Sequence, residues 1–380
     1  GNPQRTFMTD SPEEIFFLNN SFRRLISTHS NIPNIKSSLI SGLNQQKIRM
    51  NLNELSGPPS PHVISKIKES CDKVFRYPDP NWAALVKKLS IYSESPENRI
   101  VVGAGSDELI AAAGRITLSP FTDVIAPAPS FSSYAKTAAV AGAKVINIPL
   151  REDGSNDVDQ TLNKIGQATR LVFIATPNNP TGVPLSSEDI EKVAKGVPDS
   201  ALLILDEAYF EFAMEAGCRN SLKILRQRTG PWAILRTFSK AFGLAGLRVG
   251  YLICGSEQVY LAFNAARTSF NVNRIAQIAA EAALEDLNYM QDMVKNTISQ
   301  RQYLYRGLVN LGCRPFDSVA NFVMAKAPKS AKLITQELGK QNILISQINQ
   351  NGFENFIRVT ASGKKETDIF LEALRVILRS

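Results

Sequence analysis

Seven short apolar runs, separated by segments with helical spacing, occupy the middle of this 380-residue chain. Side chains in a strand point alternately to two faces, so runs that are apolar at nearly every position are typical of strands buried on both sides. Helices between such strands favour a mainly parallel sheet. The sequence therefore predicts an α/β fold with a seven-stranded, mainly parallel sheet. The predicted strands are residues 100–102, 123–126, 144–148, 171–175, 202–205, 232–235 and 249–253.

The length of the chain predicts two domains, because a single hydrophobic core usually stops growing below this size. We expect a large domain over residues 81–290 and a small α+β domain over residues 291–380. Ala279, Ala283 and Leu287 share one face of a long helical pattern, which predicts a helix that bridges the two domains. The predicted elements of the small domain are strands at 322–325, 343–345 and 356–359 and helices at 331–338 and 366–378.

Residues 1–50 are predicted to form an N-terminal extension and linker. Ser11, Pro12 and Glu14 form a capping pattern before apolar residues at three- and four-residue spacing, which predicts a short helix. An entry segment (51–80), which is proline- and glycine-rich over residues 51–61, then leads into the large domain. Near its end Pro78 fixes a turn that presents Tyr77, because proline disfavours helical geometry in the residue before it.

The composition argues against several classes of function. Lys and Arg (43) exceed Asp and Glu (35), but no run of five or more like charges marks a nucleic-acid tail. The excess fits either attraction of small anions or a merely basic surface. Four scattered cysteines and two histidines offer no zinc spacing, and no segment approaches eighteen consecutive apolar residues. We therefore expect a soluble cytoplasmic protein with no metal, no nucleic-acid partner and no membrane contact.

Lys240 stands between the predicted strand 232–235 and a turn punctuated by glycines. Thr237 and Ser239 place hydroxyl groups beside it, and Arg248 follows within the same segment. The glycines allow a backbone to approach a ligand closely. Together these residues predict a reactive amine next to an anion site, although a lysine of this kind taken alone is more often an exposed loop residue.

Two other predicted strands are followed by polar residues. Asp206 comes directly after the strand 202–205, at the edge where open α/β sheets bind ligands, although an aspartate there could simply cap a turn. Ser106 begins a helical pattern just after Gly103-Ala104-Gly105. Because Glu108 stands where a nicotinamide-binding fingerprint has its third glycine, an anion site at the helix N-terminus is the better interpretation.

Six motifs, in the same order along the chain, resemble those of pyridoxal-phosphate enzymes of the aspartate-aminotransferase fold type. The resemblance is greatest to histidinol-phosphate aminotransferases and extends from about Asn51 to the C-terminus. It implies the fold type I architecture and a homodimeric aminotransferase that moves an amino group between an amino acid or amine and a 2-oxo acid. The motifs are Arg76-Tyr77-Pro78-Asp79-Pro80, Gly105-Ser106-Asp107-Glu108, Pro177-Asn178-Asn179-Pro180-Thr181-Gly182, Asp206-Glu207-Ala208-Tyr209, the segment 237–251 and Ile357-Arg358-Val359.

The resemblance implies a role for each residue around the cofactor ring. Lys240 would bind the cofactor covalently and then move the proton at the substrate's Cα. Asp206 would keep the ring nitrogen protonated, since a charge pair at roughly 4 Å is worth about 4 kcal/mol, or about three pKa units. Asn179 and Tyr209 would donate to the ring's phenolate oxygen, and Phe131 would stack on the ring.

The resemblance also implies how the cofactor's phosphate is held. Backbone amides at a helix N-terminus, two hydroxyls and a guanidinium group would surround it. Tyr77 of the partner subunit would complete this group, so that each active site is shared between two subunits. The phosphate-binding residues of the same subunit would be Ser106, Asp107, Thr237, Ser239 and Arg248.

Arg358 matches the arginine that relatives use for the anionic group of the substrate, and we expect it to hold a carboxylate. Relatives with phosphate substrates carry a second arginine in the preceding strand, where this chain has Ser346. We therefore expect that histidinol phosphate is not the best substrate, unless Arg274 or Lys326 compensates. A local misalignment near residues 349–354 is the alternative explanation.

Two other functions stay open at this point. A threonine-phosphate decarboxylase-like enzyme would use the same cofactor scaffold and break a different bond at Cα. A non-catalytic regulator that binds pyridoxal phosphate would share the fold. The regulator is disfavoured because the residues before Asn51 show no convincing DNA-binding helix-turn-helix.

Overall fold

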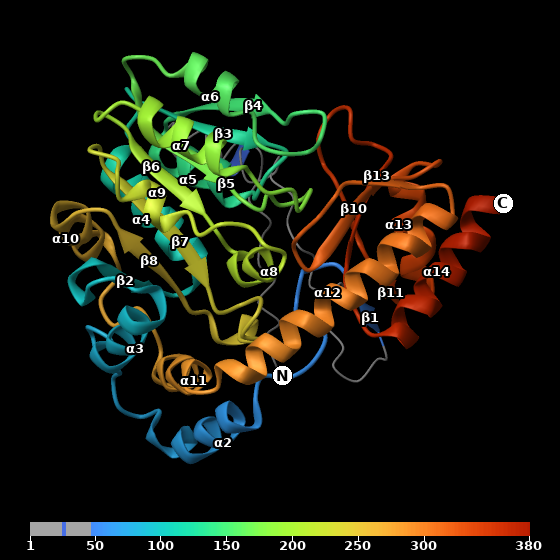
Figure 1. The fold of residues 1–380 in the computed structure, drawn as a ribbon, viewed down its shortest axis with the longest axis horizontal. Helices are drawn as coiled ribbons and strands as arrows, with labels where there is room; N and C mark the ends of the chain where they lie inside the picture. Colours follow the sequence, from blue (N-terminus) through green and yellow to red (C-terminus); the bar gives the residue numbers. More distant parts are fainter. Residues whose placement is uncertain (1–24, 28–46) are drawn as a thin grey trace, which may run out of the picture.

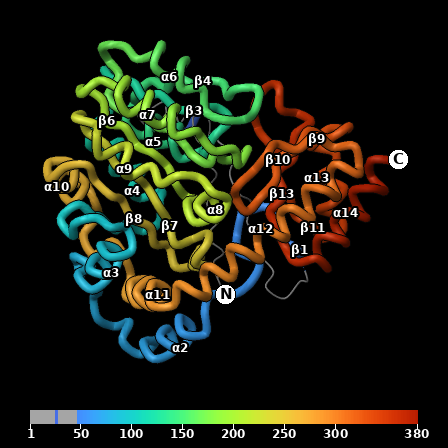
Figure 2. The backbone as a smooth tube through the Cα atoms, in the orientation of Figure 1, coloured from blue at the N-terminus to red at the C-terminus, as the bar shows by residue number. Residues whose placement is uncertain are grey.

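The computed structural model describes residues 25–27 and 47–380. Helices cover both faces of a central sheet, and a smaller unit lies beside it (Figure 1, Figure 2). The sheet has the strand order β2-β8-β7-β6-β5-β3-β4. Its strands are β2 (Ile100–Gly103), β3 (Asp123–Ala128), β4 (Lys144–Pro149), β5 (Thr169–Ala175), β6 (Leu202–Asp206), β7 (Trp232–Thr237) and β8 (Gly250–Cys254).

The central sheet confirms the predicted seven-stranded, mainly parallel arrangement. Every strand lies within two residues of its predicted bounds, and only β8 runs antiparallel to its neighbours β2 and β7. All residues of β6 and β7 are buried, as the apolar runs predicted. Because β8 reverses direction directly after β7, the connection that carries Lys240 stays at the carboxyl edge of the sheet.

Several helices begin where the sequence supplies a capping side chain. In each case a Ser or Asn oxygen accepts the backbone N–H three residues further on, which satisfies a donor that the helix leaves unpaired. These caps fix the residues at which the five helices begin. The helices are α2 (Pro61–Ser70), α7 (Ser187–Gly196), α10 (Glu257–Ala266), α11 (Arg274–Leu284) and α13 (Ala331–Lys340).

Helix α12 (Leu287–Asn310) joins two separate hydrophobic cores. Met290 and Val294, near its start, pack in the core of the large sheet. Leu304 and Leu308, near its end, pack in the core of the small unit. Figure 1 shows α12 running from one unit to the other. A bridging helix was predicted, whereas the exact domain boundaries at residues 50, 80 and 290 stay predictions.

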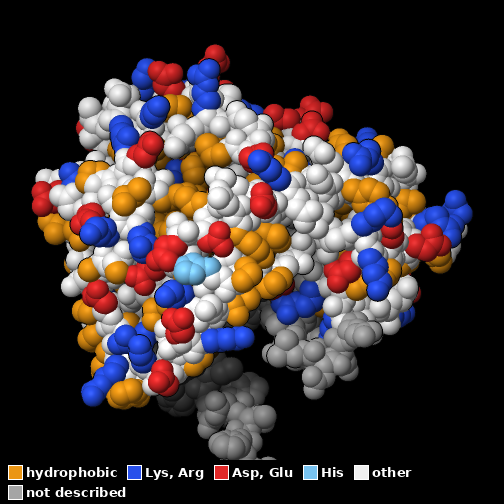
Figure 3. All heavy atoms as spheres, turned by 60° about the horizontal axis from the view of Figure 1, so that its bottom comes forward, with side chains coloured by type: hydrophobic (Ala, Val, Ile, Leu, Met, Phe, Trp, Pro, Cys, Tyr) orange, Lys and Arg blue, Asp and Glu red, His pale blue; other side chains and the backbone are white. Residues whose placement is uncertain are grey.

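The prediction of one continuous helix through this stretch is wrong, because the chain breaks between α11 and α12. Asp286 leaves the helical region, with φ −130° and ψ 56°. The adjacent Glu285 accepts from His62 at 2.7 Å and pairs with Lys88 at 3.3 Å, which lie on α2 and α3 (Ala83–Ser93). Acidic and basic side chains are interspersed over the face of the molecule that comes forward in Figure 3. The contacts of Glu285 with His62 and Lys88 favour an end of α11 at this point over a continuous helix.

The small unit confirms the predicted α+β composition. Its antiparallel sheet has the order β12-β13-β10-β9, and α14 (Lys364–Arg379) packs with α13 in the same core. The predicted strand at 343–345 is split: β11 (Ile343–Leu344) pairs with β1 (Ile48–Arg49), which was not predicted. A two-residue strand shows no alternation in the sequence. The other strands are β9 (Arg314–Pro315), β10 (Phe322–Lys326), β12 (Ser346–Gln347) and β13 (Phe356–Thr360).

The predicted extension and linker, with the helix expected to begin at Ser11, lie outside the described residues except for residues 25–27 and 47–50. Among residues 25–27 and 47–380, no helix is long and apolar enough to cross a membrane. The same residues contain no group of three or more His, Cys, Asp and Glu side chains placed to hold a metal ion. All four cysteines are free thiols.

A buried charge cluster lies behind the strand that ends at Asp206. Arg236 is 1% exposed, contacts Glu207 at 3.4 Å and lies over the ring of Phe210 at 3.5 Å. Glu211, on α8 (Phe210–Glu215), is also buried. Burial raises the pKa of Glu211 to about 8, although attraction to Arg236 opposes the shift. The folded protein therefore keeps a proton on Glu211 at neutral pH, while the unfolded chain releases it.

We expect Glu211→Gln to flatten the pH dependence of stability. The native pKa is raised, so the contribution of Glu211 is fully present below its unfolded pKa and is lost as the pH rises toward 8. The loss is roughly 1.4 kcal/mol for each pH unit over which only the folded state holds the proton. Thermal unfolding midpoints between pH 5 and pH 8.5 measure this, with the exposed Glu215→Gln as control. An unchanged slope in Glu211→Gln would contradict it.

Candidate active site

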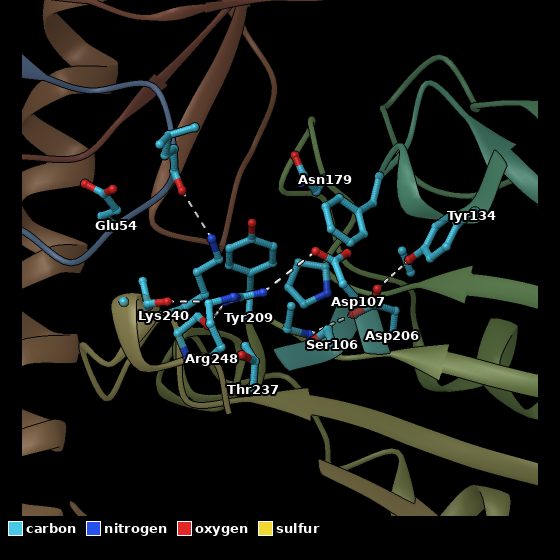
Figure 4. Close-up of a pocket in the computed structure, with 18 of the residues that line it drawn as sticks. Glu54, Ser106, Asp107, Tyr134, Asn179, Asp206, Tyr209, Thr237, Lys240 and Arg248 are labelled. Carbon is cyan, nitrogen blue, oxygen red and sulfur yellow. Dashed lines mark hydrogen bonds and ion pairs between the residues drawn. The ribbon is translucent and has the colours of Figure 1, made fainter. Parts of the chain in front are cut away.

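A cavity of about 470 Å³ opens at the carboxyl ends of the central strands (Figure 4). Arg358 instead lines an adjoining cavity of about 650 Å³, which shares Asn179 and Lys240 with the first. Tyr77 lines neither. The structure thus brings ten of the twelve predicted site residues together in one cavity. They are Ser106, Asp107, Phe131, Asn179, Asp206, Tyr209, Thr237, Ser239, Lys240 and Arg248.

The sheet topology explains why these residues converge. Asp206 is the last residue of β6, and Thr237 is the last residue of β7. Ser106 and Asp107 open α4 (Gly105–Thr117), which begins two residues after the end of β2. β2, β6 and β7 run in the same direction, so their carboxyl ends meet at one edge, where open α/β sheets bind ligands.

Lys240 presents an amine with few partners in the cavity. Its Nζ donates to the backbone carbonyl of Leu52 at 3.2 Å. Burial lowers the pKa of Lys240 to about 8, and the positive charge of Arg358 adds to this effect. A substantial fraction of the amine is therefore neutral near pH 8, which is the form that attacks a carbonyl group or accepts a proton.

Asp206 is a buried carboxylate whose two oxygens both accept hydrogen bonds. Its Oδ1 accepts the backbone N–H of Ala208 at 3.1 Å, and its Oδ2 accepts the hydroxyl of Tyr134 at 2.5 Å. Burial raises the pKa of Asp206, while these two bonds oppose the shift. Tyr134 was missed by the sequence analysis. The available signal was an aromatic residue three positions after Phe131, with nothing to indicate that it faces β6.

Hydrogen-bond donors gather at one end of the cavity and form what we call the donor cup. Its members are the N-terminus of α4, Thr237, Ser239 and Arg248. The hydroxyl of Thr237 accepts the backbone N–H of Ser239 at 3.0 Å, and Arg248 donates to the Ser239 hydroxyl at 3.4 Å. Arg248 also pairs with Asp107 at 3.7 Å. Gly105 has φ +76°, and a side chain there would collide with the Arg248 guanidinium group. The glycine therefore lets the positive charge approach the N-terminus of α4, which favours an anion.

Asn179 and Tyr209 keep donors available toward the cavity. The side-chain oxygen of Asn179 accepts from Arg358 at 2.8 Å, which leaves its amide N–H groups without a protein acceptor in these contacts. The hydroxyl of Tyr209 accepts from the Asn53 side chain at 2.9 Å. Because this oxygen is already an acceptor, its own proton is free to donate. Burial raises the pKa of Tyr209 to about 12, so it remains protonated.

Arg358 is held by the small unit at the boundary of the two cavities. Besides Asn179, its guanidinium group donates to the carbonyl of Asn51 at 2.7 Å and the hydroxyl of Ser346 at 3.3 Å. Ser346 lies directly opposite Arg358 in the pairing of β12 with β13. Its hydroxyl donates to the Asn51 carbonyl at 2.8 Å. The serine thus supports the arginine and adds no second charge.

Arg274 and Lys326, which might have compensated for the missing arginine at Ser346, line neither cavity. Arg274 donates to the carbonyl of Tyr77 at 2.7 Å, outside both cavities, and Lys326 is exposed at the end of β10. Arg49 and Glu54, which pair at 2.5 Å, line the first cavity instead. The sequence analysis missed this pair, because Arg49 lies in the unpredicted strand β1.

Tyr77 lies outside both cavities of its own chain. It is 78% exposed, and its ring stacks on Phe270 with centroids 4.6 Å apart. Phe75 and Val74 beside it are 75% and 62% exposed. The participation of Tyr77 in a site of the partner subunit therefore stays a prediction, and one chain alone does not bring it into the site.

Comparisons with known proteins agree with this geometry. The family model described as aminotransferase class I and II matches residues 45–374. The chain is 37% identical to histidinol-phosphate aminotransferase 2 of Carboxydothermus hydrogenoformans, covering 84% of this chain and 88% of that protein. It is 35% identical to the histidinol-phosphate aminotransferase of Staphylococcus carnosus, covering 88% and 92%.

A solved structure gives the same result. The crystal structure of histidinol-phosphate aminotransferase from Sinorhizobium meliloti, in complex with pyridoxal-5'-phosphate, matches with a TM-score of 0.87 and 27% identity. The match covers 96% of this chain and 99% of that one. The fold type I architecture is therefore confirmed. By sequence and by structure, the chain belongs to the aminotransferase class I and II family and is similar to histidinol-phosphate aminotransferases.

Proposed function

We propose that this chain is a pyridoxal-phosphate-dependent aminotransferase that moves an amino group between an amino acid or amine and a 2-oxo acid. The observation that carries the proposal is the convergence of Lys240, Asp206 and a donor cup on one cavity. When bound, pyridoxal 5'-phosphate supplies a conjugated ring that withdraws electrons from the substrate's Cα. The protein supplies binding, orientation and proton transfer.

The side chains that line the cavity match the functional groups of this cofactor in chemical type. The α4 N-terminus, Thr237, Ser239 and Arg248 offer donors and positive charge for a phosphate group. Asp206 offers a buried carboxylate for a protonated ring nitrogen. Asn179 and Tyr209 offer hydrogen-bond donors to the phenolate oxygen, and Phe131 offers an aromatic face. These residues are the partners that one chain offers to the cofactor's polar groups.

Lys240 has two tasks in this proposal. Its partly neutral amine binds the cofactor covalently in the resting enzyme. Once the substrate amine has taken its place, Lys240 would accept the proton from the substrate's Cα and deliver it to the imine carbon of the cofactor. Its pKa of about 8 suits this work, because a base acts best when its pKa lies near the operating pH.

We expect the purified protein to be yellow and borohydride reduction to fix the cofactor on a peptide that contains Lys240. Lys240→Ala should still bind the cofactor noncovalently but lose at least about a hundred-fold in kcat, the scale of general acid–base catalysis. Mass spectrometry of the reduced peptide and steady-state rates measure these outcomes. The exposed Lys223→Ala is the control. Recovery of the reduced cofactor on another lysine would defeat the assignment.

The two alternative functions have distinct products or partners. A threonine-phosphate decarboxylase-like enzyme would release carbon dioxide and would not consume 2-oxoglutarate. Product analysis with and without 2-oxoglutarate separates it from an aminotransferase. A regulator without catalysis would bind DNA, and a gel shift at several salt concentrations tests this, because phosphate contacts make such binding salt-dependent.

We also propose a homodimer in which Tyr77 reaches the phosphate-binding cup of the partner subunit. The exposed aromatic and aliphatic side chains around Tyr77 support this, because neighbouring exposed apolar residues of this kind favour a protein contact. Arg274 and Phe270 hold Tyr77 from its own chain, so its hydroxyl is free to serve another one.

We expect Tyr77→Phe to weaken cofactor binding by about 1–2 kcal/mol, the scale of one hydrogen bond to a charged group, without unfolding the protein. Mixing Tyr77→Phe with Lys240→Ala chains tests the sharing. A mixed dimer contains one site that lacks both groups and one site with both intact, so part of the activity should return. If verified mixed dimers recover no activity, Tyr77 acts in the active site of its own subunit and the proposal of shared sites fails.

The substrate is proposed to carry a carboxylate that binds Arg358. Among the described residues that line the adjoining cavity, Arg358 and Lys240 are the only charged ones. The Nε of Arg358 is buried without a partner, which leaves a donor available. Ser346 provides no second cation for a phosphate dianion. We therefore propose that an amino acid without a phosphate group is a better donor than histidinol phosphate.

We expect kcat/KM to be lower for histidinol phosphate than for the best unphosphorylated amino acid. Removing one partner of a buried charge pair typically costs about 2–5 kcal/mol, or roughly thirty- to several-thousand-fold. Ser346→Arg should raise the histidinol phosphate activity. The exposed Asn351→Arg adds the same charge outside both cavities and should not. A clear preference of the unmodified enzyme for histidinol phosphate would reject this prediction.

A further inference from the structure

The hydroxyl of Tyr134 is held in a fixed position by its ring. Tyr134 lies in α5 (Ser133–Ala141) and is only 2% exposed. Its ring stacks on Phe173 of β5, with centroids 4.3 Å apart and planes at 14°. The edge of Phe131 packs against it at 6.0 Å and 89°. With the ring held by two aromatic neighbours, the hydroxyl that contacts Asp206 cannot easily point elsewhere.

We propose that Tyr134 is a positioning residue that acts through Asp206. Its hydroxyl fixes the plane of the carboxylate and favours the ionised form, and so determines how firmly Asp206 holds a protonated ring nitrogen. Tyr134 and Ala208 bind one oxygen each, which leaves the remaining lone pairs for the cofactor. This inference rests on the proposed function, because it assigns Asp206 to the cofactor ring. Figure 4 shows the Tyr134 hydroxyl directed at Asp206, and both residues line the cavity.

The charges around Asp206 make this hydroxyl important. Lys240 lies on the cavity side, and its positive charge favours the ionised carboxylate. Asp107 from α4 opposes ionisation, as does burial, which is the largest effect and raises the pKa of Asp206. Behind the strand, Glu207 is paired with Arg236. Among the interactions that lower the pKa of Asp206, the hydrogen bond from Tyr134 has the largest effect.

Tyr134 remains a donor throughout the working range of pH. Burial and the nearby negative charge of Asp206 raise its pKa well above the ordinary value for tyrosine. The hydroxyl therefore keeps its proton and directs it at the carboxylate. Removing the hydroxyl oxygen of Tyr134 does not change the charge of the site. The effect of this oxygen can therefore be measured without removing a catalytic group.

The test compares Tyr134→Phe with the unmodified protein in binding of pyridoxal phosphate to the apoprotein. We expect Kd at pH 7 to rise about ten-fold, the scale of one hydrogen bond to a charged group. The pH below which affinity falls should move upward, because the carboxylate without its donor protonates more readily. Tyr303→Phe removes a hydroxyl bond to Asp368 in the small unit and is the matched control. Equal Kd values and equal pH profiles would overturn the proposal.

A double-mutant cycle separates positioning from a merely structural role. If Tyr134 acts through Asp206, the Tyr134→Phe change should have little effect on Kd in an Asp206→Asn background. If the two effects multiply instead, Tyr134 acts independently and the proposal fails. A protein that binds no pyridoxal phosphate in its unmodified form would refute the proposed function and not this inference alone.

A second variant covers the case in which Tyr134→Phe does not fold. Replacing Tyr134 with 3-fluorotyrosine keeps the size of the ring and makes the hydroxyl a stronger donor. The pH below which cofactor affinity falls should then move downward, opposite to the effect of Tyr134→Phe. Circular dichroism verifies that each variant is folded. No shift in the fluorotyrosine protein would overturn the proposal.

Discussion

Desolvation at the carboxyl edge of the central sheet is the constraint on which the site depends. Burial favours the neutral form of every ionisable group, so it raises the pKa of Asp206 and lowers that of Lys240. An aminotransferase needs opposite results from the two groups, an ionised carboxylate and a partly neutral amine. The fold gives Asp206 two donors, from Tyr134 and Ala208, whereas the Lys240 amine has the Leu52 carbonyl as its one hydrogen-bond acceptor among the described residues. The same environment therefore produces two different reactive groups.

The site combines groups that belong to two different hydrophobic cores. Asp206, Lys240 and the donor cup belong to the large sheet, while Arg358 comes from β13 of the small unit. The Asn51 carbonyl accepts from both Arg358 and Ser346, so the segment that follows β1 also positions the arginine. Under the proposed function, cofactor binding and substrate recognition thus belong to separate units. A change in the small unit would then alter which anion is bound while the cofactor's surroundings stay the same.

The parts of the structure that were predictable are those that leave a local pattern. Uninterrupted apolar runs located all seven central strands, and the residues just after them, such as Asp206 and Thr237, converge because parallel strands end together. Tyr134 could not be assigned, because its contact depends on how α5 is rotated against β6. Arg49 was missed for a related reason, since β1 is too short for a periodic signal and its partner is far along the chain. The α11–α12 break depends on tertiary contacts of Glu285.

The pairing of β1 with β11 affects how the protein forms during synthesis. Ile48 leaves the ribosome early, but its partner Ile343 is made only after the whole large sheet. Met50 likewise belongs to the core of the small unit, together with Ile377 near the end of the chain. The large sheet can assemble first, since domains generally fold as units from the N-terminus. The small unit must wait for the last helix, so cotranslational folding leaves Arg358, the arginine proposed for the substrate, until the end.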